Sequence, residues 1–444
     1  MLKEKLEQFI IDNPEDREFK VNGKVYTDQE LYEKEIELFF EKSWVYVCHE
    51  DQIKQENDYF LAQIGKEPVI ITRSADGQIQ GFINRCPHRG ATVCREHQGN
   101  SKSFRCFYHG WTFRNNGDCI GVADQQAYPS NFDKSKHGLT KVAKVESYRG
   151  FVFASLEENV PTLEEHLGNA KPFLDVVIDR YADGIEVANG VTKYGNVGNW
   201  KLQLENALDY YHPLFVHKSY FDIVAKRGVK RENASLQFKE RVVDHQLYLG
   251  GGHGLTVHYR DFLKAGYLEG ELFQSDFRTP EWEEKVGPLM AKWTQKISMH
   301  LLIFPNLLIM EGPALQIRQI RPVSVDRTEV YGRAYYPKGQ PDEYTSRQLA
   351  AYEFLGPAGH GTPDDIAAFE SCTVGYQSEK APWNNLSRGY DREVTDASEL
   401  EISELSNFEV AGNISDDTFL RAMFRHWKEQ LAEEKDASKK EVHA

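Results

Sequence analysis

The pattern of apolar and polar positions changes character along the chain. In YTDQELYEKEIELFFEKSW, residues 26–44, apolar residues recur at the spacing of one helix face, which predicts a helix. Thr27 followed three residues later by Glu30 is typical of a capping box at its start. We therefore expect residues 1–43 to form an N-terminal helical segment that packs on the main domain.

Short β-type runs separated by turn residues follow over residues 44–160. PVIITR is followed by Asp76-Gly77 and IQGFIN, and GWTF is followed by Asn116-Gly117. Both arrangements are typical of a β-hairpin. RGFVFASL predicts a further strand, so the simplest interpretation of this region is a small all-β domain.

The remaining residues, 161–444, mix both periodicities. NWKLQLENALDYYH has helical spacing, while ISMHLLIFPNLLIM and ALQIRQIRPVSV are typical of buried strands. DDTFLRAMFRHWKEQLAEE predicts an amphipathic helix whose apolar side includes Phe419 and Trp427. Together these elements predict a larger α+β domain with an antiparallel sheet.

Composition narrows the possible class of protein. The chain of 444 residues contains no run of about 18 apolar residues and no apolar core of a signal peptide at its start, so we expect a soluble cytoplasmic protein with no membrane partner. The net charge of -15 argues against nucleic-acid binding, which requires a basic face. Without a secretory signal, the six cysteines favour ligands or buried thiols over disulfides.

Metal-ligating residue types gather in NRCPHRGATVCREHQGNSKSFRCFYHGW, residues 84–111. They form two pairs, Cys86-x-His88 and Cys106-x2-His109, separated by 17 residues. Two such pairs can form a tetrahedral Cys2His2 zinc site. They also supply the ligands of a Rieske [2Fe-2S] cluster, in which two cysteines hold one iron and two histidines hold the other.

The two pairs, together with the flanking HRG and YHGW, resemble the motif of the Rieske non-haem iron oxygenases, specifically the catalytic α subunits of aromatic-ring-hydroxylating enzymes. The resemblance implies that all four residues hold one [2Fe-2S] cluster. Cys94 and His97 fall inside the spacer, match no ligand position and are interpreted as structural. Cys48, Cys119 and Cys372 stand alone and are interpreted as buried thiols.

A second group of candidate ligands lies in ENALDYYHPLFVH. A 2-His-1-carboxylate triad holds Fe(II) with open positions and needs two imidazoles close together. On a regular helix His212 and His217 would point about 140° apart. Pro213 disfavours helical geometry at His212, so we expect a local break that brings the rings together. From the residues alone, a histidine pair without a metal stays an alternative.

The D-x2-H-x4-H spacing after NWKL resembles the first part of the iron site in the same family. The resemblance implies a mononuclear Fe(II) held by His212, His217 and a carboxylate from GPAGHGTPDDIAAFE. We assign this carboxylate to Asp365, with Asp364 as the second choice. The alternative interpretation of this segment is a helix N-cap formed by Asp364 or Thr362.

Two further residues belong to the predicted catalytic centre, Asn206 and Asp209. In the family the residue at the position of Asp209 bridges an iron-ligand histidine to a cluster histidine of a neighbouring subunit. The resemblance therefore implies that Asp209 links His212 to His109 of the next chain, in an α3 or α3β3 assembly with a small β subunit. A helix-surface aspartate is the alternative.

The substrate is suggested by QIRQIRP, which places Arg318 and Arg321 on a predicted strand. A buried arginine often pairs with an internal acid. Family members that act on aromatic carboxylic acids often carry an arginine at the position of Arg318, so the resemblance implies that its guanidinium binds the substrate carboxylate. ENALDYYH most resembles the branch acting on benzoate-like acids, such as anthranilate, salicylate and terephthalate, with indole-derived acids as further possibilities.

The predicted fold is α+β: a small all-β Rieske domain and a larger catalytic domain of helix-grip type. The predicted activity is that of a terminal oxygenase that uses O2 to hydroxylate an aromatic ring, by cis-dihydroxylation. Since the sequence has no flavin or nicotinamide motif, electrons are expected from a separate reductase or ferredoxin. The alternatives are a Rieske monooxygenase or demethylase with the same ligands, and a zinc-stabilised binding protein without redox chemistry.

Overall fold

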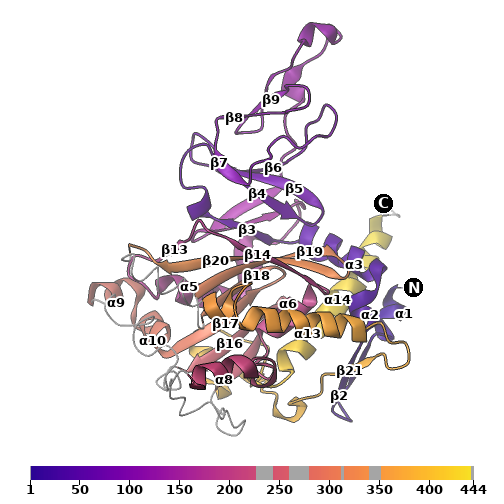
Figure 1. Cartoon of the computed structure of the whole chain (residues 1–444), viewed down its shortest axis with the longest axis vertical. Coiled ribbons are helices and arrows are strands. Elements are labelled where there is room, and N and C mark those ends of the chain that lie inside the picture. Colours follow the sequence, from indigo (N-terminus) through magenta and orange to yellow (C-terminus); the bar gives the residue numbers. More distant parts are fainter. Residues whose placement is uncertain (1, 227–243, 260–279, 312–314, 340–351, 442–444) are drawn as a thin grey trace. The chain divides into compact units, whose positions relative to one another are not determined.

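The computed structural model describes residues 2–226, 244–259, 280–311, 315–339 and 352–441 (Figure 1). The chain divides into two compact units. The larger unit contains Met1–Lys34 and Leu167–Ala444, and the smaller unit contains Glu35–His166. In the part of the chain that is described, no helix combines the length and apolar character needed to cross a membrane.

The smaller unit consists mainly of antiparallel strands in three sheets, with the orders β11-β12-β3, β6-β5-β4-β7 and β10-β9-β8. The strands are β3 (Val45–His49), β4 (Asp58–Ile64), β5 (Glu67–Arg73), β6 (Ile79–Ile83), β7 (Gln98–Asn100), β8 (Ser103–Arg105), β9 (Thr112–Arg114), β10 (Cys119–Gly121), β11 (Lys144–Tyr148) and β12 (Phe151–Ser155). The helical turns are η1 (Ile36–Glu41), η2 (Glu50–Gln52), η3 (Gln125–Ala127), η4 (Lys134–Lys136) and most of α4 (Leu163–Leu167).

Both predicted hairpins of this unit are confirmed. β5 pairs antiparallel with β6, and β9 pairs antiparallel with β10. The turn glycines Gly77 and Gly117 have φ values of 83° and 87°, a conformation that glycine adopts without steric cost. The strand predicted in RGFVFASL is β12, and all of its residues are buried.

The larger unit is built around a nine-stranded antiparallel sheet with the order β13-β20-β19-β18-β17-β16-β15-β22, in which β14 also pairs with β20. Its strands are β13 (Ile185–Val187), β14 (Thr192–Val197), β15 (His245–Gly250), β16 (His253–Tyr259), β17 (Ile297–Ile303), β18 (Leu307–Glu311), β19 (Leu315–Ser324), β20 (Arg327–Pro337) and β22 (Val410–Asn413). A smaller sheet contains β1 (Ile10–Asn13), β2 (Glu18–Asn22) and β21 (Trp383–Asn385).

In Figure 1 the helices of the larger unit lie to the sides of this sheet and below it. They are α1 (Leu2–Glu7), α2 (Lys24–Thr27), α3 (Gln29–Glu35), α5 (Lys171–Asp179), α6 (Lys201–Ala207), α7 (Pro213–Val216), α8 (Lys218–Lys226), α9 (Pro280–Val286), α10 (Pro288–Lys296), α12 (Tyr352–Leu355), α13 (Gly361–Gly375) and α14 (Thr418–Glu441). Short 3-10 turns are η5 (Gly168–Ala170), η9 (Tyr390–Arg392), η10 (Ala397–Glu399) and η11 (Glu401–Glu404). α14 packs against β15 and β22, and α13 packs against β14. The predicted burial of Phe419 and Trp427 on α14 is confirmed.

The predicted N-terminal helix forms in three pieces, α2, α3 and η1, and its capping box is wrong. The Asp28 carboxylate, rather than the Thr27 hydroxyl, accepts a hydrogen bond from the backbone N–H of Leu31 (3.1 Å). The Thr27 hydroxyl donates to the carbonyl of Gly23 instead. The helix therefore starts one residue later than predicted, because aspartate is as good a cap as threonine and lies next to it.

The two faces of the central sheet differ in polarity. Residues opposite each other on antiparallel strands point to the same side of a sheet. The register therefore places on one face the polar residues His300, Gln316 and Arg318. On the other face it places Leu301, Ile309 and Ile317, which are fully buried and apolar.

The polar face is covered by the segment that follows α6. Leu208 and Phe419 approach Gly254 on this face so closely that a Cβ atom there would lie 2.4 Å and 2.2 Å from their side chains. This close approach sets the C-terminal end of α6, and the candidate ligands that follow it, against the polar side of the sheet.

Candidate functional site

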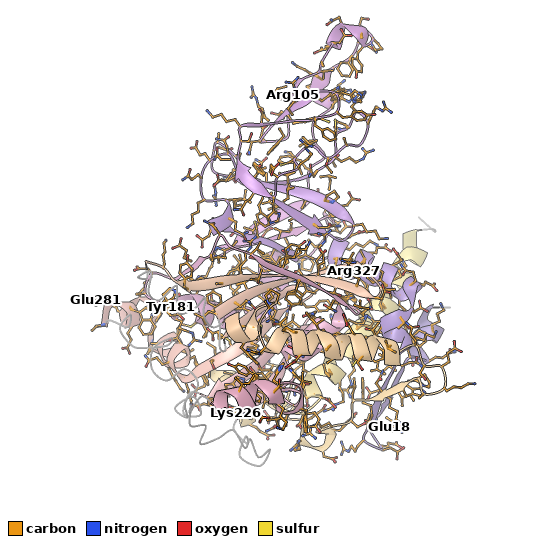
Figure 2. All side chains as sticks on the ribbon, in the orientation of Figure 1. Glu18, Arg105, Tyr181, Lys226, Glu281 and Arg327 are labelled. Atoms are coloured by element: carbon orange, nitrogen blue, oxygen red, sulfur yellow. The ribbon has the colours of Figure 1, made fainter. Side chains whose placement is uncertain are left out.

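In the smaller unit, the two Cys-His pairs lie in loops with the same backbone hydrogen bonds. In each loop the cysteine N–H donates to the carbonyl five residues further on, at 2.8 Å for both Cys86 and Cys106. The glycine four residues after each cysteine donates back to the cysteine carbonyl, at 2.9 Å for Gly90 and 3.0 Å for Gly110. Both glycines have positive φ, 79° and 70°. The second loop directly follows Arg105, the last residue of β8 (Figure 2).

These two loops bring two thiols and two imidazoles to one place. The rings of His88 and His109 lie 4.5 Å apart, and the Cys86 thiol lies beside that of Cys106. Burial raises the pKa of Cys86. A tetrahedral zinc ion would need all four donor atoms within about 4 Å of one another, given zinc–ligand bonds of 2.0–2.3 Å. Two neighbouring thiols and two neighbouring imidazoles are also the donor set of a Rieske cluster, in which two cysteines hold one iron and two histidines hold the other.

The other cysteines and His97 lie outside these loops. Cys94 is buried, and its backbone N–H and C=O both bond to the side chain of Asn84. Cys48 and Cys119 are buried as predicted, but the same prediction for Cys372 is wrong. Cys372 is exposed because it lies in the last turns of α13, where most neighbouring residues also face solvent.

In the larger unit, His212, His217 and Asp365 bring one donor atom each within 4.8 Å of one another. Asp365 Oδ1 lies 3.6 Å from His212 Nε2 and 3.3 Å from His217 Nε2. The two imidazole rings are 5.4 Å apart. Two imidazoles and one carboxylate at these distances can hold one divalent ion and leave further coordination positions open.

The histidines converge because two short helices replace one long one. α6 ends at Ala207 and α7 begins at Pro213, so the helix is interrupted before His212. His212 itself has helical dihedral angles (φ −60°, ψ −36°). The expectation that Pro213 would move His212 out of helical geometry is therefore wrong. Proline suits the first turn of α7, where its missing N–H would have no partner. α7 lasts one turn, and His217 leaves helical geometry (φ −95°, ψ 18°).

Asp365 and Asp364 approach the histidines differently. α13 begins at Gly361, so the predicted N-cap at Asp364 or Thr362 is wrong. Thr362 and Asp364 lie in the first turn of the helix, and Asp365 directly follows it. Asp365 is largely buried and faces both Nε2 atoms. Asp364 Oδ2 instead lies 3.5 Å from Nδ1 of His217, the nitrogen on the other side of that ring.

Asn206 and Asp209 also contact the triad. The Asn206 amide donates to Asp365 Oδ1 (3.3 Å) and lies 3.2 Å from His212 Nε2. Asp209 Oδ2 lies 3.1 Å from Nδ1 of His212. A carboxylate in this position fixes the ring orientation and leaves Nε2 free for a metal.

The charges of the site act on its titratable groups. Burial lowers the pKa of His212, but hydrogen bonding to Asp209 and the charge of Asp365 outweigh it, so the pKa is raised overall. Burial lowers the pKa of His217 and raises that of Asp365. The carboxylates of Asp209 and Asp365 both face the His212 ring, and a bound cation would compensate their negative charge.

Arg318 lies on β19, on the polar face of the sheet, and is 5% exposed. Its Nε donates to Gln316 Oε1 (2.5 Å), while its Nη2 has no hydrogen-bond partner among the described residues. Its charge nevertheless reaches Asp365, whose pKa it lowers against the dominant effect of burial. Arg321, by contrast, pairs with Glu329 at 3.6 Å.

The chain matches two protein families over most of its length. Residues 43–146 match the Rieske [2Fe-2S] domain, and residues 187–403 match the ring hydroxylating alpha subunit (catalytic domain). The large subunit of 2-halobenzoate 1,2-dioxygenase from Burkholderia cepacia is 36% identical, over 86% of this chain and 82% of the relative. The chain belongs to the ring-hydroxylating dioxygenase alpha subunits.

Other members of the family agree with this membership. Toluate 1,2-dioxygenase subunit alpha from Pseudomonas putida is 34% identical over 93% of this chain and 91% of the relative. The anthranilate 1,2-dioxygenase large subunit from Acinetobacter baylyi is 36% identical over 85% of this chain and 82% of the relative. The solved structure of naphthalene 1,2-dioxygenase from Rhodococcus sp. bound to indole is 27% identical, covers 93% of this chain and 94% of that one, and has a TM-score of 0.81.

Membership of this alpha-subunit family confirms the predicted α+β fold and the predicted enzyme class, a Rieske ring-hydroxylating oxygenase and thus an oxidoreductase. The Rieske domain indicates a [2Fe-2S] cluster, and the catalytic domain indicates a non-haem iron. The donor sets described above, two thiols with two imidazoles and two imidazoles with one carboxylate, fit these two groups.

Sequence reasoning missed two residues close to the triad, Tyr210 and His300. Tyr210 stands between Asp209 and the first histidine, and His300 interrupts the apolar run ISMHLLIF on β17. A histidine inside an otherwise apolar strand was a sequence signal that could have found it, because a buried polar group needs a hydrogen-bond partner.

Proposed function

We propose that this protein is a terminal oxygenase that cis-dihydroxylates the ring of an aromatic carboxylic acid. The proposed ligands are Cys86, His88, Cys106 and His109 for the cluster, and His212, His217 and Asp365 for the iron. The observation that carries the proposal is the convergence of two imidazoles and a carboxylate beside a buried arginine that has an unused donor.

The chain's own residues orient the metal ligands and exclude water from the site. Cys86, His88, Cys106 and His109 would hold a cluster that supplies single electrons, and His212, His217 and Asp365 would hold an iron that supplies the activation of O2. Asp209 holds the His212 ring through Nδ1, and Asn206 bonds to Asp365. The buried sheet face behind them excludes water from the reacting ring.

The proposed substrate class follows from Arg318. A guanidinium can bind a carboxylate through two parallel hydrogen bonds. Arg318 is buried on the polar sheet face, its Nη2 lacks a partner among the described residues, and its charge reaches Asp365. The relatives named above are dioxygenases of 2-halobenzoate, toluate and anthranilate, all aromatic carboxylates.

Arg318→Leu is expected to raise KM for a benzoate-type acid roughly tenfold, since a hydrogen bond to a charged group is worth about 1.5 kcal/mol or more. The value of kcat for a neutral aromatic compound should change little. Arg321→Leu is the matched control, because Arg321 lies on the same strand but pairs with Glu329. Equal KM values in wild type and Arg318→Leu would refute the carboxylate role.

The proposed working unit is a ring of three chains, α3, or α3β3 with a small β subunit. Exposed aromatic residues flank the ligands of both centres: Phe107 and Tyr108 beside His109, and Tyr211 and Phe215 near His212. Such aromatics are typical of interfaces. The proposal is that Asp209 of one chain meets His109 of the next, as part of a cytoplasmic assembly that receives electrons from a separate reductase or ferredoxin and binds no flavin or nicotinamide itself.

The activity is tested with 18O2, a reductase and a set of benzoate-type acids. Two labelled oxygen atoms from one O2 in a cis-diol product would support the proposal. One labelled atom, or loss of a methyl group, would identify a monooxygenase or demethylase instead. Failure of the iron-loaded protein to oxidise any aromatic acid while it turns over neutral aromatic compounds would contradict the substrate class.

A further inference from the structure

The turn between α6 and α7, residues 208–212, carries both Asp209 and His212 but lies outside regular helix. Two of its backbone N–H groups make long hydrogen bonds, Asp209 to the Asn206 carbonyl at 3.3 Å and Tyr210 to the Ile414 carbonyl at 3.4 Å, whereas the His212 carbonyl accepts from α7 at 2.9 Å. Asp209 Oδ1 accepts from the N–H of Tyr211 at 2.5 Å. Side chains must therefore supply much of what fixes this turn.

His300 contacts both the helix end that leads into the turn and the middle of the turn. It lies on β17, is 7% exposed and faces the turn from the polar side of the sheet. Its Nδ1 lies 3.1 Å from the carbonyl oxygen of Ala207, the last residue of α6. Its Nε2 lies 3.0 Å from the hydroxyl of Tyr210, which follows Asp209. One imidazole thus joins a helix-end carbonyl, which needs a donor, to the middle of the turn.

The two contacts require one neutral form of the ring. A carbonyl oxygen only accepts, so Nδ1 must carry the proton, and Nε2 then accepts from the Tyr210 hydroxyl. Burial lowers the pKa of His300 to about 3, so the ring stays neutral at physiological pH. Both nitrogens are then satisfied within the protein.

Tyr210 is held from a second side as well. Its ring packs edge-on against His258, with centroids 4.3 Å apart. His258 Nδ1 in turn lies 3.3 Å from Asp244, a fully buried carboxylate directly before the neighbouring strand β15. A displacement of the turn would therefore break the packing of Tyr210 against His258 and its buried hydrogen bond to His300.

We infer that His300 and Tyr210 form a positioning pair that holds residues 208–212, and with them Asp209 and His212, in the geometry of the triad. This inference rests on the proposed function for its catalytic consequence. Neither residue is a proposed iron ligand, and neither is needed to bind the substrate carboxylate. They act through the backbone of the turn.

The test compares His300→Leu, His300→Gln and Tyr210→Phe with wild type. Leucine removes both hydrogen bonds, glutamine keeps one donor and one acceptor, and phenylalanine removes only the hydroxyl. Met299→Leu is the matched control, because Met299 is the adjacent buried residue on the opposite face of β17 and this change conserves volume. Hydrogen exchange of the 208–212 amides is measured in metal-free protein, followed by iron content, kcat and KM after loading.

His300→Leu should speed exchange of these amides and lower kcat about tenfold, with little change in KM, as expected for loss of a group that orients a metal-site residue. His300→Gln should restore most of the slow exchange and most of kcat. Tyr210→Phe should give values between those of wild type and His300→Leu. The inference would be overturned if His300→Leu had the same exchange rates and kcat as Met299→Leu. If His300→Leu fails to fold, exchange rates and kcat of Tyr210→Phe equal to those of wild type would overturn it instead. Since exchange is read without metal, a wild-type protein that binds no iron refutes the proposed function while this readout still decides the inference.

Discussion

Asp365→Ala is expected to abolish ring hydroxylation and the binding of mononuclear iron, while the [2Fe-2S] cluster remains. Asp365 Oδ1 faces the Nε2 atoms of both His212 and His217, so its removal leaves two imidazoles without the anionic ligand. Three protein ligands are the minimum of a facial triad. Because the proposed cluster ligands belong to the other unit, the visible absorbance of the cluster should persist.

Asp364→Ala is the matched control for this change. Asp364 directly precedes Asp365 on α13, and its Oδ2 lies 3.5 Å from Nδ1 of His217, on the other side of that ring. Loss of such a supporting contact weakens metal affinity or activity by about 10- to 100-fold rather than abolishing it. Iron counted per cluster, together with product formation, separates the two variants. Iron lost from Asp364→Ala but kept in Asp365→Ala would reverse the assignment.

Asp209→Asn is expected to lower turnover about a hundredfold with both metal centres retained, at the upper end of the effect of residues that support a metal ligand. Asparagine has the shape of aspartate but lacks the charge that raises the pKa of His212. In the proposed assembly it would also weaken the link to His109 of the next chain, so electron transfer should suffer more than oxygen chemistry.

The measurement is rapid mixing of protein carrying a reduced cluster with substrate and O2, followed by the rate of cluster reoxidation. Asp222→Asn serves as control, because Asp222 is an exposed aspartate on α8, paired with Lys218. Reoxidation in Asp209→Asn as fast as in wild type, combined with slow product formation, would show that Asp209 serves the iron site but not the electron path.

The features that sequence predicted well are local. The two Cys-His pairs each lie within four residues, and the hairpins at Gly77 and Gly117 are fixed by turn residues that need positive φ. The amphipathic helix α14 follows from its own periodicity. For these features the determining residues lie close together in the chain, so one sequence carries the information.

The features that it missed depend on contacts between distant segments. Tyr210 and His300 are 90 residues apart, and they meet because the turn after α6 packs against the polar face of the sheet. The assignment of Asp365 as the third iron ligand rested on a family resemblance and not on any local pattern. The capping box at Thr27 and the caps assigned to Asp364 and Thr362 failed because several suitable caps stand side by side, and tertiary packing selects where each helix begins.

The position of the break near Pro213 illustrates the same limit. Proline correctly indicated that the helix is interrupted, but the structure places the interruption before His212, where His300 and Asp209 hold the turn. A local rule identified the disturbance, and distant side chains determine its geometry.

The central claim is that one chain carries both a Rieske cluster and a separate iron. Its most direct test is to purify the protein anaerobically, count iron and acid-labile sulfide, and record the EPR spectrum of the reduced protein. About three irons and two sulfides per chain, with a mixed-valent Rieske signal, are expected. Zinc without sulfide, or a cluster with no additional iron after loading, would contradict the central claim.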